Sequence, residues 1–312
     1  MKRKLITLLV AGSCLFLASC GDKGATEPDE NSSLSDYSSQ SESRSSESES
    51  EPESQDASDS QAPKDLEQIV DELCQSEYVE DSTGTKVPDS DYLPLPDFEA
   101  LPANAVFDVQ WETTDGSYAA GTSFLMKTDL TENPLLITAI HFFGDEDYIS
   151  GEALPEYVQG GEIYDIMKDI DAPADGTISG VFPVPDATAF GAVETASKDV
   201  AAFTVEDTSA MNAFPMASEP CKPGDMIYLA ARLDSEYIYE DNLYPCVVVS
   251  DDGTDLYYIL TDTFTTSGAS GCPLLNSKGE VVGIHIASNG STRYGHSISS
   301  IYEQLKASPE AQ

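Results

Sequence analysis

The chain has 312 residues, and its 56 acidic and 15 basic side chains give a formal net charge of −41 at pH 7. A field of this sign repels phosphate backbones and anionic lipid headgroups, which excludes a nucleic-acid-binding protein. With 40% hydrophobic and 9% aromatic residues, the chain can build a packed core, so wholesale disorder is excluded as well.

The first residues have the pattern of an export signal. Lys2-Arg3-Lys4 precedes an apolar run from Leu5 to Leu17, which is shorter than the roughly 20 residues needed to span a bilayer. The string that ends at Cys20, Leu17-Ala18-Ser19-Cys20, resembles a bacterial lipobox. We predict a lipoprotein signal peptide at 1–19 and a lipid on Cys20 that anchors the exported chain to the extracytoplasmic face of the cell membrane. The alternative is an ordinary cleaved signal with a chance cysteine.

Two further segments precede the main domain. Residues 20–62 are predicted to be a disordered stalk, because 14 serines and 12 acidic residues between positions 21 and 62 leave almost no apolar surface to bury. Residues 63–102 begin with a helical spacing of apolar residues and continue as a Pro-rich connection. We expect a short helix that packs on the following domain; a regulatory pro-segment is the alternative.

Residues 103–312 are predicted to form an all-β domain, because apolar and polar residues alternate in short runs that are separated by turn residues. A terminal helix is expected from Ser300 to Leu305. The acidic segment from Gly144 to Thr188 is interpreted as an insert that shapes access for substrates. The predicted strands cover residues 107–111, 122–126, 135–139, 226–231, 246–250, 256–261 and 281–286.

The mature chain keeps four cysteines besides Cys20: Cys74, Cys221, Cys246 and Cys272. An exported chain can form disulfides, and four cysteines allow three pairings, or all four can stay reduced. No cysteine or histidine spacing fits a zinc site, so no metal and no cofactor are expected.

Gly268-Ala269-Ser270-Gly271-Cys272-Pro273 is the first string that indicates chemistry. A nucleophilic serine needs an exposed hydroxyl on a tight turn, with backbone N–H groups ready for a developing oxyanion. Its proton must be taken by a base. His141 ends an apolar strand that begins at Leu135, and Asp199 directly precedes another apolar strand. The order histidine, aspartate, serine is one of the three orders in which such triads occur.

These strings resemble the three signature blocks of trypsin/chymotrypsin-like serine proteases: Thr138-Ala139-Ile140-His141, Asp199-Val200-Ala201 and Gly268-Ala269-Ser270-Gly271-Cys272-Pro273. The resemblance implies two six-stranded antiparallel β-barrels over residues 103–312. It also implies Ser270 as nucleophile, His141 as general base, Asp199 as its orienting acid, and the N–H groups of Gly268 and Ser270 as oxyanion donors. Cys272 takes a place that is usually small, either as a filler or as a redox-sensitive neighbour.

The strings around the expected specificity pocket resemble those of bacterial glutamyl endopeptidases. Phe264 stands where an acid would recognise Arg or Lys, and Gly283-Ile284-His285 matches the pocket strand. The resemblance implies His285 as the main donor to a substrate carboxylate, with Thr265, Ser267 and Ser288 assisting and His296 as a candidate to support His285. The negative charge of the chain is expected to raise the histidine pKa values and favour a charged His285. A pocket for a small apolar side chain is the alternative.

The sequence therefore predicts a membrane-anchored serine endopeptidase that cleaves peptides or proteins through an acyl-enzyme, with a preference for Glu. We expect a monomer whose partners are its substrate and the membrane. The alternative is an inactive domain of the same fold that binds peptides as a surface lipoprotein.

Overall fold

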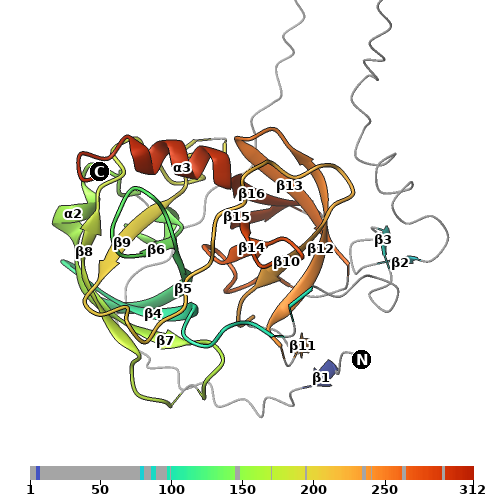
Figure 1. Cartoon of the computed structure of the whole chain (residues 1–312), viewed down its shortest axis with the longest axis horizontal. Coiled ribbons are helices and arrows are strands. Elements are labelled where there is room, and N and C mark those ends of the chain that lie inside the picture. The colour runs from blue at the N-terminus through green and yellow to red at the C-terminus, as the bar shows by residue number, and fades with distance from the viewer. Residues whose placement is uncertain are drawn as a thin grey trace, which may run out of the picture. The chain divides into compact units, whose positions relative to one another are not determined.

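The computed structural model describes residues 97–98, 100–144, 148–169, 171–193, 195–233, 241–261, 265–289 and 292–312, together with the isolated short strands given below. Within these residues the chain forms two closed antiparallel barrels of six strands each (Figure 1). The predicted fold class is therefore confirmed.

The first barrel joins its strands in the order β4-β5-β6-β9-β8-β7. The alternation predicted near its start is present: Phe107, Val109 and Trp111 are fully buried, whereas the residues between them are half-buried. Its strands are β4 (Val106–Thr113), β5 (Gly116–Met126), β6 (Leu135–Thr138), β7 (Val158–Asp165), β8 (Gly176–Phe182) and β9 (Ala201–Val205).

The second barrel joins its strands in the order β10-β12-β13-β16-β15-β14. Its strands are β10 (Met226–Ala230), β12 (Leu243–Asp251), β13 (Asp255–Leu260), β14 (Pro273–Leu275), β15 (Val281–Asn289) and β16 (Thr292–Ser297). Two further pairs of three-residue strands lie outside the barrels: β1 (Leu5–Thr7) with β11 (Tyr237–Tyr239), and β2 (Tyr78–Glu80) with β3 (Lys86–Pro88).

The interpretation of residues 144–188 as an insert was wrong, because this segment supplies β7 and β8 of the first barrel as well as the short helix α2 (Leu154–Tyr157). Glycines interrupt its apolar pattern, which hid the strands. Gly161 shows why they are there: a Cβ atom at this position would lie 2.9 Å from the carbonyl oxygen of Gln110 on β4. The glycine lets the neighbouring strand approach closely.

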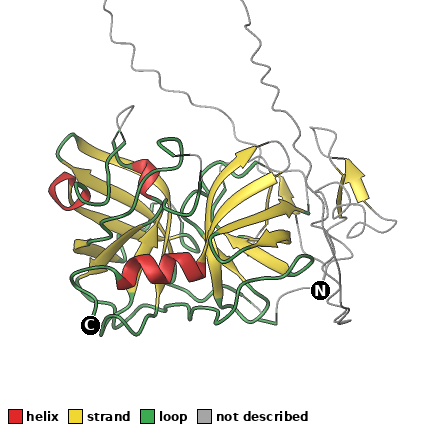
Figure 2. Ribbon diagram, turned by 90° about the horizontal axis from the view of Figure 1, so that it is seen from above, coloured by secondary structure: helices red, strands yellow, loops and turns green. Residues whose placement is uncertain are grey.

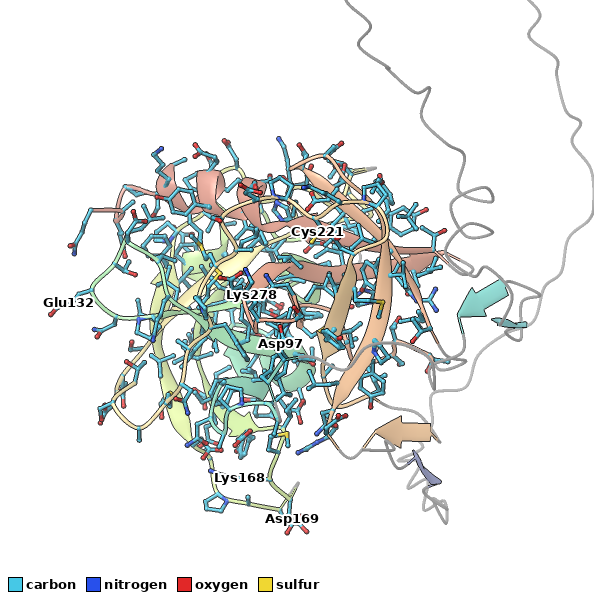
Figure 3. All side chains as sticks on the ribbon, turned by 45° about the vertical axis from the view of Figure 1, so that its right-hand side comes forward. Asp97, Glu132, Lys168, Asp169, Cys221 and Lys278 are labelled. Carbon is cyan, nitrogen blue, oxygen red and sulfur yellow. The ribbon has the colours of Figure 1, made fainter. Side chains whose placement is uncertain are left out.

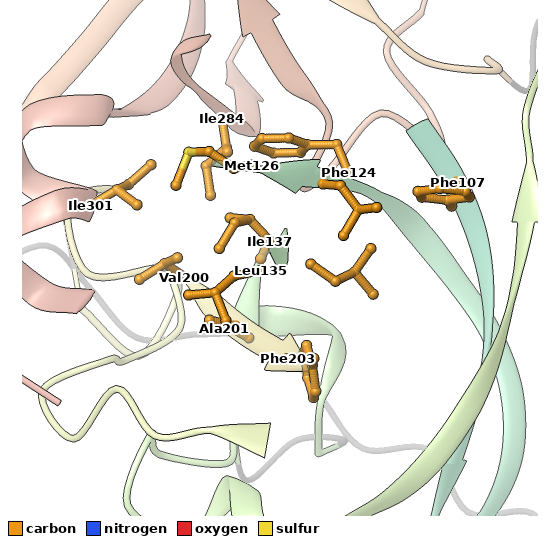
Figure 4. Packing of buried hydrophobic residues seen from close by; sticks show 14 of the residues in the cluster. Phe107, Phe124, Met126, Leu135, Ile137, Val200, Ala201, Phe203, Ile284 and Ile301 are labelled. Carbon is orange, nitrogen blue, oxygen red and sulfur yellow. The ribbon is translucent and has the colours of Figure 1, made fainter. Parts of the chain in front are cut away.

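One hydrophobic core continues from the first barrel into the second. The ring of Trp111 lies 4.9 Å from those of both Phe143 and Phe203, measured between centroids. The same cluster includes Ile284 of β15 and Ile301 of the terminal helix, which Figure 4 shows beside the first-barrel side chains. Shared apolar burial therefore holds the two barrels together at the place where the predicted site residues meet.

The terminal helix α3 (Ile298–Lys306) packs on β15 and β16 through its buried side chains Ile298, Ile301 and Leu305. Figure 2 shows it as the long helix beside the barrels. It starts two residues before the predicted Ser300, so Ser300 does not cap it. The Ser300 hydroxyl instead contacts His296 and the carbonyl oxygen of Ser197.

Several predictions fall on residues that are not described. They are the signal peptide, Cys20, the stalk, the helix expected after residue 63, and Cys74. Cys221, Cys246 and Cys272 are buried thiols, and none of the described cysteines forms a disulfide. In the described part of the chain, no helix has the length and apolar character needed to cross a membrane.

Candidate active site

The first barrel delivers His141 to its edge. Strand β6 is buried along its whole length, and a 3-10 turn, η2 (Ile140–Phe142), follows after one residue. Ile140 is buried in the core, whereas the His141 side chain remains 21% exposed. The apolar strand and Ile140 therefore fix the backbone while the imidazole faces outward.

Asp199 is completely buried and holds the imidazole. Its Oδ2 lies 2.8 Å from Nδ1 of His141, and its Oδ1 accepts the backbone N–H groups of Ile140 and His141 at 2.8 and 3.2 Å. The N–H of Phe190 donates to Oδ2 at 2.8 Å. Because a carboxylate only accepts, Nδ1 carries the proton and Nε2 is left as the acceptor. This tautomer is the one that a general base requires.

Helix α3 anchors the loop before Asp199. The Nε2 amide of Gln304 donates to the carbonyl oxygen of Ser197 at 2.6 Å, and it lies 3.0 Å from Nε2 of His296. His296 thus contacts α3 and does not support His285 as expected. Burial lowers the pKa of His296 to about 4, although the nearby charge of Asp199 acts in the opposite direction. It is a neutral structural residue at neutral pH.

Two backbone donors of the serine turn find no acceptor in the part of the chain that the structure describes. Gly268 and Gly271 have φ values of 86° and 78°, which favour glycine. The N–H groups of Ala269, Gly271 and Cys272 donate to Thr266, His285 and Ala269, respectively. Among the residues that the structure describes, the N–H groups of Gly268 and Ser270 have no acceptor. These are the two groups that the sequence assigned to an oxyanion.

Strand β5 fastens this turn to the first barrel. Thr122 donates its N–H to the carbonyl oxygen of Ser270 and its hydroxyl to that of Gly268, both at 2.9 Å. A Cβ atom on Gly271 would lie 2.3 Å from Oγ1 of Thr138 and 2.9 Å from the nitrogen of Ala139. The serine turn is therefore in contact with the segment that leads directly to His141.

The Ser270 hydroxyl itself is turned toward β15. It donates to the carbonyl oxygen of Ile286 at 3.3 Å, and the described contacts of His141 include no bond to it. The structure thus joins two of the three predicted residues, His141 and Asp199, by a hydrogen bond. The turn that carries the third residue, Ser270, packs against the first barrel. Hydrogen bonds of this kind are commonly long or misaligned before substrate binds.

His285 lies inside the second barrel and is only 2% exposed. Burial lowers its pKa to about 3, assisted by the charges of Arg293 and then His141. The expected charged His285 was therefore wrong: desolvation and nearby cations outweigh the negative field of the surface. The hydroxyl of Tyr258 lies 2.6 Å from its Nδ1, and burial raises the pKa of that tyrosine. A neutral tyrosine donates to Nδ1, which leaves a proton on Nε2.

The predicted hydroxyl donors are only partly brought together. Ser288 is exposed and its Oγ lies 2.7 Å from Oγ1 of Thr266, a residue that the sequence analysis passed over in favour of Thr265. Thr265 and Ser267 are exposed. Phe264 lies outside the described residues. Adjacent threonines cannot be ranked from sequence, because only the turn geometry decides which hydroxyl reaches β15.

Arg293, which no sequence pattern singled out, lies beside Ser288 in the strand register and is only 8% exposed. The pattern that could have identified Arg293 is a lone cation at an inward position of an alternating strand. In β16, Arg293 and Gly295 are buried, whereas Thr292 and Tyr294 are half-buried.

Cys272 is buried directly after the serine turn, and burial raises the pKa of its thiol well above the ordinary value. A thiol with a raised pKa carries little thiolate at neutral pH and is a poor nucleophile. This environment favours the filler interpretation of Cys272 over the redox-sensitive one.

A cavity of about 590 Å³ begins at Gly268 and extends over the first barrel. Its wall includes Gly121, Asp108, Lys168 and Arg232. Figure 3 shows Lys168 and its neighbour Asp169 on the loop that projects from this barrel. His285 and Ser288 are not among the described residues that line it. No group of three or more potential metal ligands occurs among the described residues.

A comparison with known protein families identifies the domain. The family model described as "Trypsin-like peptidase domain" matches residues 121–284, more than half of the 312-residue chain. No curated protein matches the sequence.

Several solved structures are similar to the chain at low identity. A protease from M. tuberculosis in its active form is 15% identical, with 67% of this chain and 82% of that chain covered and a TM-score of 0.44. A Glu endopeptidase in complex with MPD is 16% identical, with 66% and 90% covered and a TM-score of 0.46. A serine endoprotease from Yersinia pestis is 13% identical, with 66% and 64% covered and a TM-score of 0.43.

Proposed function

Because the chain belongs to the family of trypsin-like peptidase domains and is a serine endopeptidase, we propose that it hydrolyses peptide bonds with Ser270, His141 and Asp199. One observation carries the assignment of these residues. A buried carboxylate fixes the proton of His141 on Nδ1, and the serine turn packed against the same segment has two N–H groups that find no acceptor among the described residues. A base, a nucleophile and an oxyanion site are the three parts that acyl transfer requires.

In the proposed reaction, the Ser270 hydroxyl turns from the Ile286 carbonyl to Nε2 of His141, which takes its proton as the oxygen attacks the substrate carbonyl. The N–H groups of Gly268 and Ser270 donate to the oxyanion. The imidazolium then gives the proton to the leaving amine, and water repeats the sequence to release the acyl group. Buried Asp199 stabilises the imidazolium, because its negative charge stays within 2.8 Å of Nδ1.

We propose a preference for glutamate at the residue that supplies the attacked carbonyl. The support is the donor set on one side of Ser270: Nε2–H of His285, whose Nδ1 is occupied by Tyr258, and the hydroxyls of Thr266 and Ser288. Hydrogen bonds to a carboxylate are stronger than those to a neutral acceptor. His285 takes part as a neutral donor, since its pKa is about 3.

A serine-reactive fluorophosphonate tests the nucleophile. Wild-type protein should be labelled, Ser270→Ala should not be, and Ser179→Ala should be labelled like the wild type because Ser179 is an exposed serine of β8. Hydrolysis of a peptide library by the same three proteins gives the activity. Equal labelling of the two variants would contradict the assignment of Ser270.

A second candidate function is supported by the Ser270 hydroxyl, which donates to Ile286 and not to His141. A domain in which this arrangement persists with substrate bound would hold peptides without cleaving them. The two candidates differ in one result: the peptide-binding domain would bind library peptides in both the wild type and Ser270→Ala, and neither protein would be labelled.

We also propose that the domain is exported and held at the extracytoplasmic membrane face by a lipid on Cys20, through the stalk at 20–62. The support is the sequence pattern of the first 20 residues. Mass spectrometry of the mature N-terminus tests it: Cys20 should carry a diacylglycerol, and Cys20→Ala should be recovered without the lipid mass. An unmodified N-terminus at another residue would contradict the anchor.

A further inference from the structure

Arg293 occupies an inward position of β16 at the wall of the proposed specificity pocket. In the strand register it pairs with Tyr258 of β13 on one side and with Ser288 of β15 on the other. Directly paired residues of antiparallel strands have their side chains on the same face, about 5 Å apart at Cβ. Arg293 therefore shares a face with the tyrosine that holds His285 and with the serine that bonds to Thr266.

This position is close to the nucleophile. Ile286 accepts the Ser270 hydroxyl, and Ser288 is two residues further along the same strand, which corresponds to about 7 Å. Arg293 lies directly across from Ser288. A substrate side chain that runs from the attacked carbonyl along β15 therefore reaches the neighbourhood of the guanidinium.

The charge of Arg293 acts on the polar groups of this wall. It is among the causes that lower the pKa of His285, and it opposes the rise of the pKa of Tyr258. Coulomb interactions weaken with distance, so the guanidinium lies within electrostatic reach of both groups. Arg293 is only 8% exposed, and a planar guanidinium can bind a carboxylate through two parallel hydrogen bonds.

We propose that Arg293 supplies the positive charge that selects an acidic side chain, aspartate or glutamate, at the residue whose carbonyl Ser270 attacks. In this arrangement His285 and the hydroxyls of Ser288 and Thr266 orient the carboxylate as neutral donors. The inference rests on the proposed function, because it requires Ser270 to cleave the peptide.

The proposal separates two ways of recognising an acid. Arginine stays protonated at every pH at which the enzyme works, so a preference carried by Arg293 is constant between pH 6 and pH 9. A preference carried by a charged histidine with an ordinary pKa would be lost as the pH rises through about 6.5. The titratable groups that face His285 or its partner Tyr258 are Arg293, His141, Cys246 and Cys272. Protonation of His141 slows all substrates alike and cancels in a ratio of two substrates.

The experiment compares kcat/KM for matched peptides with Glu, Asp, Gln or Ala before the cleaved bond. Wild type should prefer Glu to Gln by about 10- to 100-fold, the factor that a charge-assisted hydrogen bond supplies. That Glu-to-Gln ratio should be the same at pH 6, 7, 8 and 9. Arg293→Met should bring the ratio near one while Gln and Ala peptides are still cleaved, and Arg293→Lys should keep part of it. Lys278→Met, which removes an exposed cation from the turn after β14, is the matched control and should leave the ratio unchanged.

Fluorophosphonate labelling of Ser270 in each variant checks that the site is intact. Two results would overturn the role of Arg293. One is a Glu-to-Gln ratio that stays high in labelled Arg293→Met, and the other is a wild-type ratio that declines as the pH rises through about 6.5. The wild-type pH series decides the question even where Arg293→Met fails to fold. Absence of hydrolysis by the wild type with every peptide would overturn the proposed function, and the role of Arg293 with it.

Discussion

The two sides of the junction between the barrels place a histidine in opposite environments. On the first barrel, His141 is partly exposed and its Nδ1 faces a buried carboxylate. In the second barrel, the Nδ1 of His285 faces the Tyr258 hydroxyl, and burial, assisted by the charges of Arg293 and then His141, lowers the pKa of His285 to about 3. The same imidazole is thus prepared as a proton acceptor in one place and as a fixed neutral donor in the other. The partner of Nδ1 and the degree of burial make the difference, not the residue type.

The largest expected effect on activity comes from removing the carboxylate beside His141. In Asp199→Asn, an amide can donate to Nδ1 and reverse the tautomer, so that Nε2 no longer accepts the serine proton. We expect kcat to fall by about 10⁴-fold, measured on a cleaved peptide, with the exposed Asp186→Asn as the control that retains activity. A loss of less than tenfold would show that the orientation of His141 does not depend on Asp199.

The contact between the two barrels should respond to a single methyl group. Gly271→Ala places a Cβ atom 2.3 Å from Oγ1 of Thr138 at a φ of 78°, and we expect the free energy of unfolding to fall by about 2–4 kcal/mol through crowding and backbone strain. Gly253→Ala is the matched control, since its φ is 82° but its nearest atom is 3.9 Å away. It should cost about 1–2 kcal/mol. Equal losses in urea denaturation would show that the junction tolerates the added methyl group.

The buried imidazole of His285 should make the fold sensitive to acid. The unfolded chain takes up a proton as the pH falls through about 6.5, whereas folded His285 takes it up only near 3. The free energy of unfolding is therefore highest above pH 6.5, and it falls by up to about 1.4 kcal/mol per pH unit below that value. His296 acts with the same sign down to about pH 4.

Urea denaturation of the wild type and His285→Gln between pH 7.5 and 4.5 isolates the contribution of His285. The difference in the free energy of unfolding between the two proteins should shrink as the pH falls, because the variant lacks one of the two buried histidines whose protonation destabilises the fold. A constant difference would contradict a neutral, buried His285.

The smallest expected effect concerns the helix that anchors the loop before Asp199. Gln304→Ala removes the donor to the carbonyl oxygen of Ser197, and we expect a loss of about 1–2 kcal/mol in the free energy of unfolding, because buried polar groups are left without partners. Glu303→Gln, on the exposed side of the same helix, should change it by less than about 0.5 kcal/mol. Thermal unfolding of both variants provides the comparison, and similar shifts would mean that α3 does not hold this loop.

Much of the fold was accessible from local patterns, but two barrel strands were not. Alternating burial identified β4, and an apolar run identified β6 with His141 just beyond its end. Strands β7 and β8 were read as an insert, because glycine at position 161 serves the close approach of β4 and breaks the apolar pattern. The terminal helix was placed two residues late, since Ser300 has the sequence of a cap but serves a tertiary contact.

What the sequence determined by itself is local: the glycines that shape the turn around Ser270, and the apolar strands that precede His141 and follow Asp199. Short-range sterics and burial are encoded within a few residues, so these features can be read directly. The tertiary structure alone decided the neutral state of His285, the contact of Thr266 rather than Thr265 with Ser288, and the position of Arg293 across from Ser288. Each depends on desolvation and on cross-strand neighbours that are distant in the chain, and the order of residues along one strand contains neither.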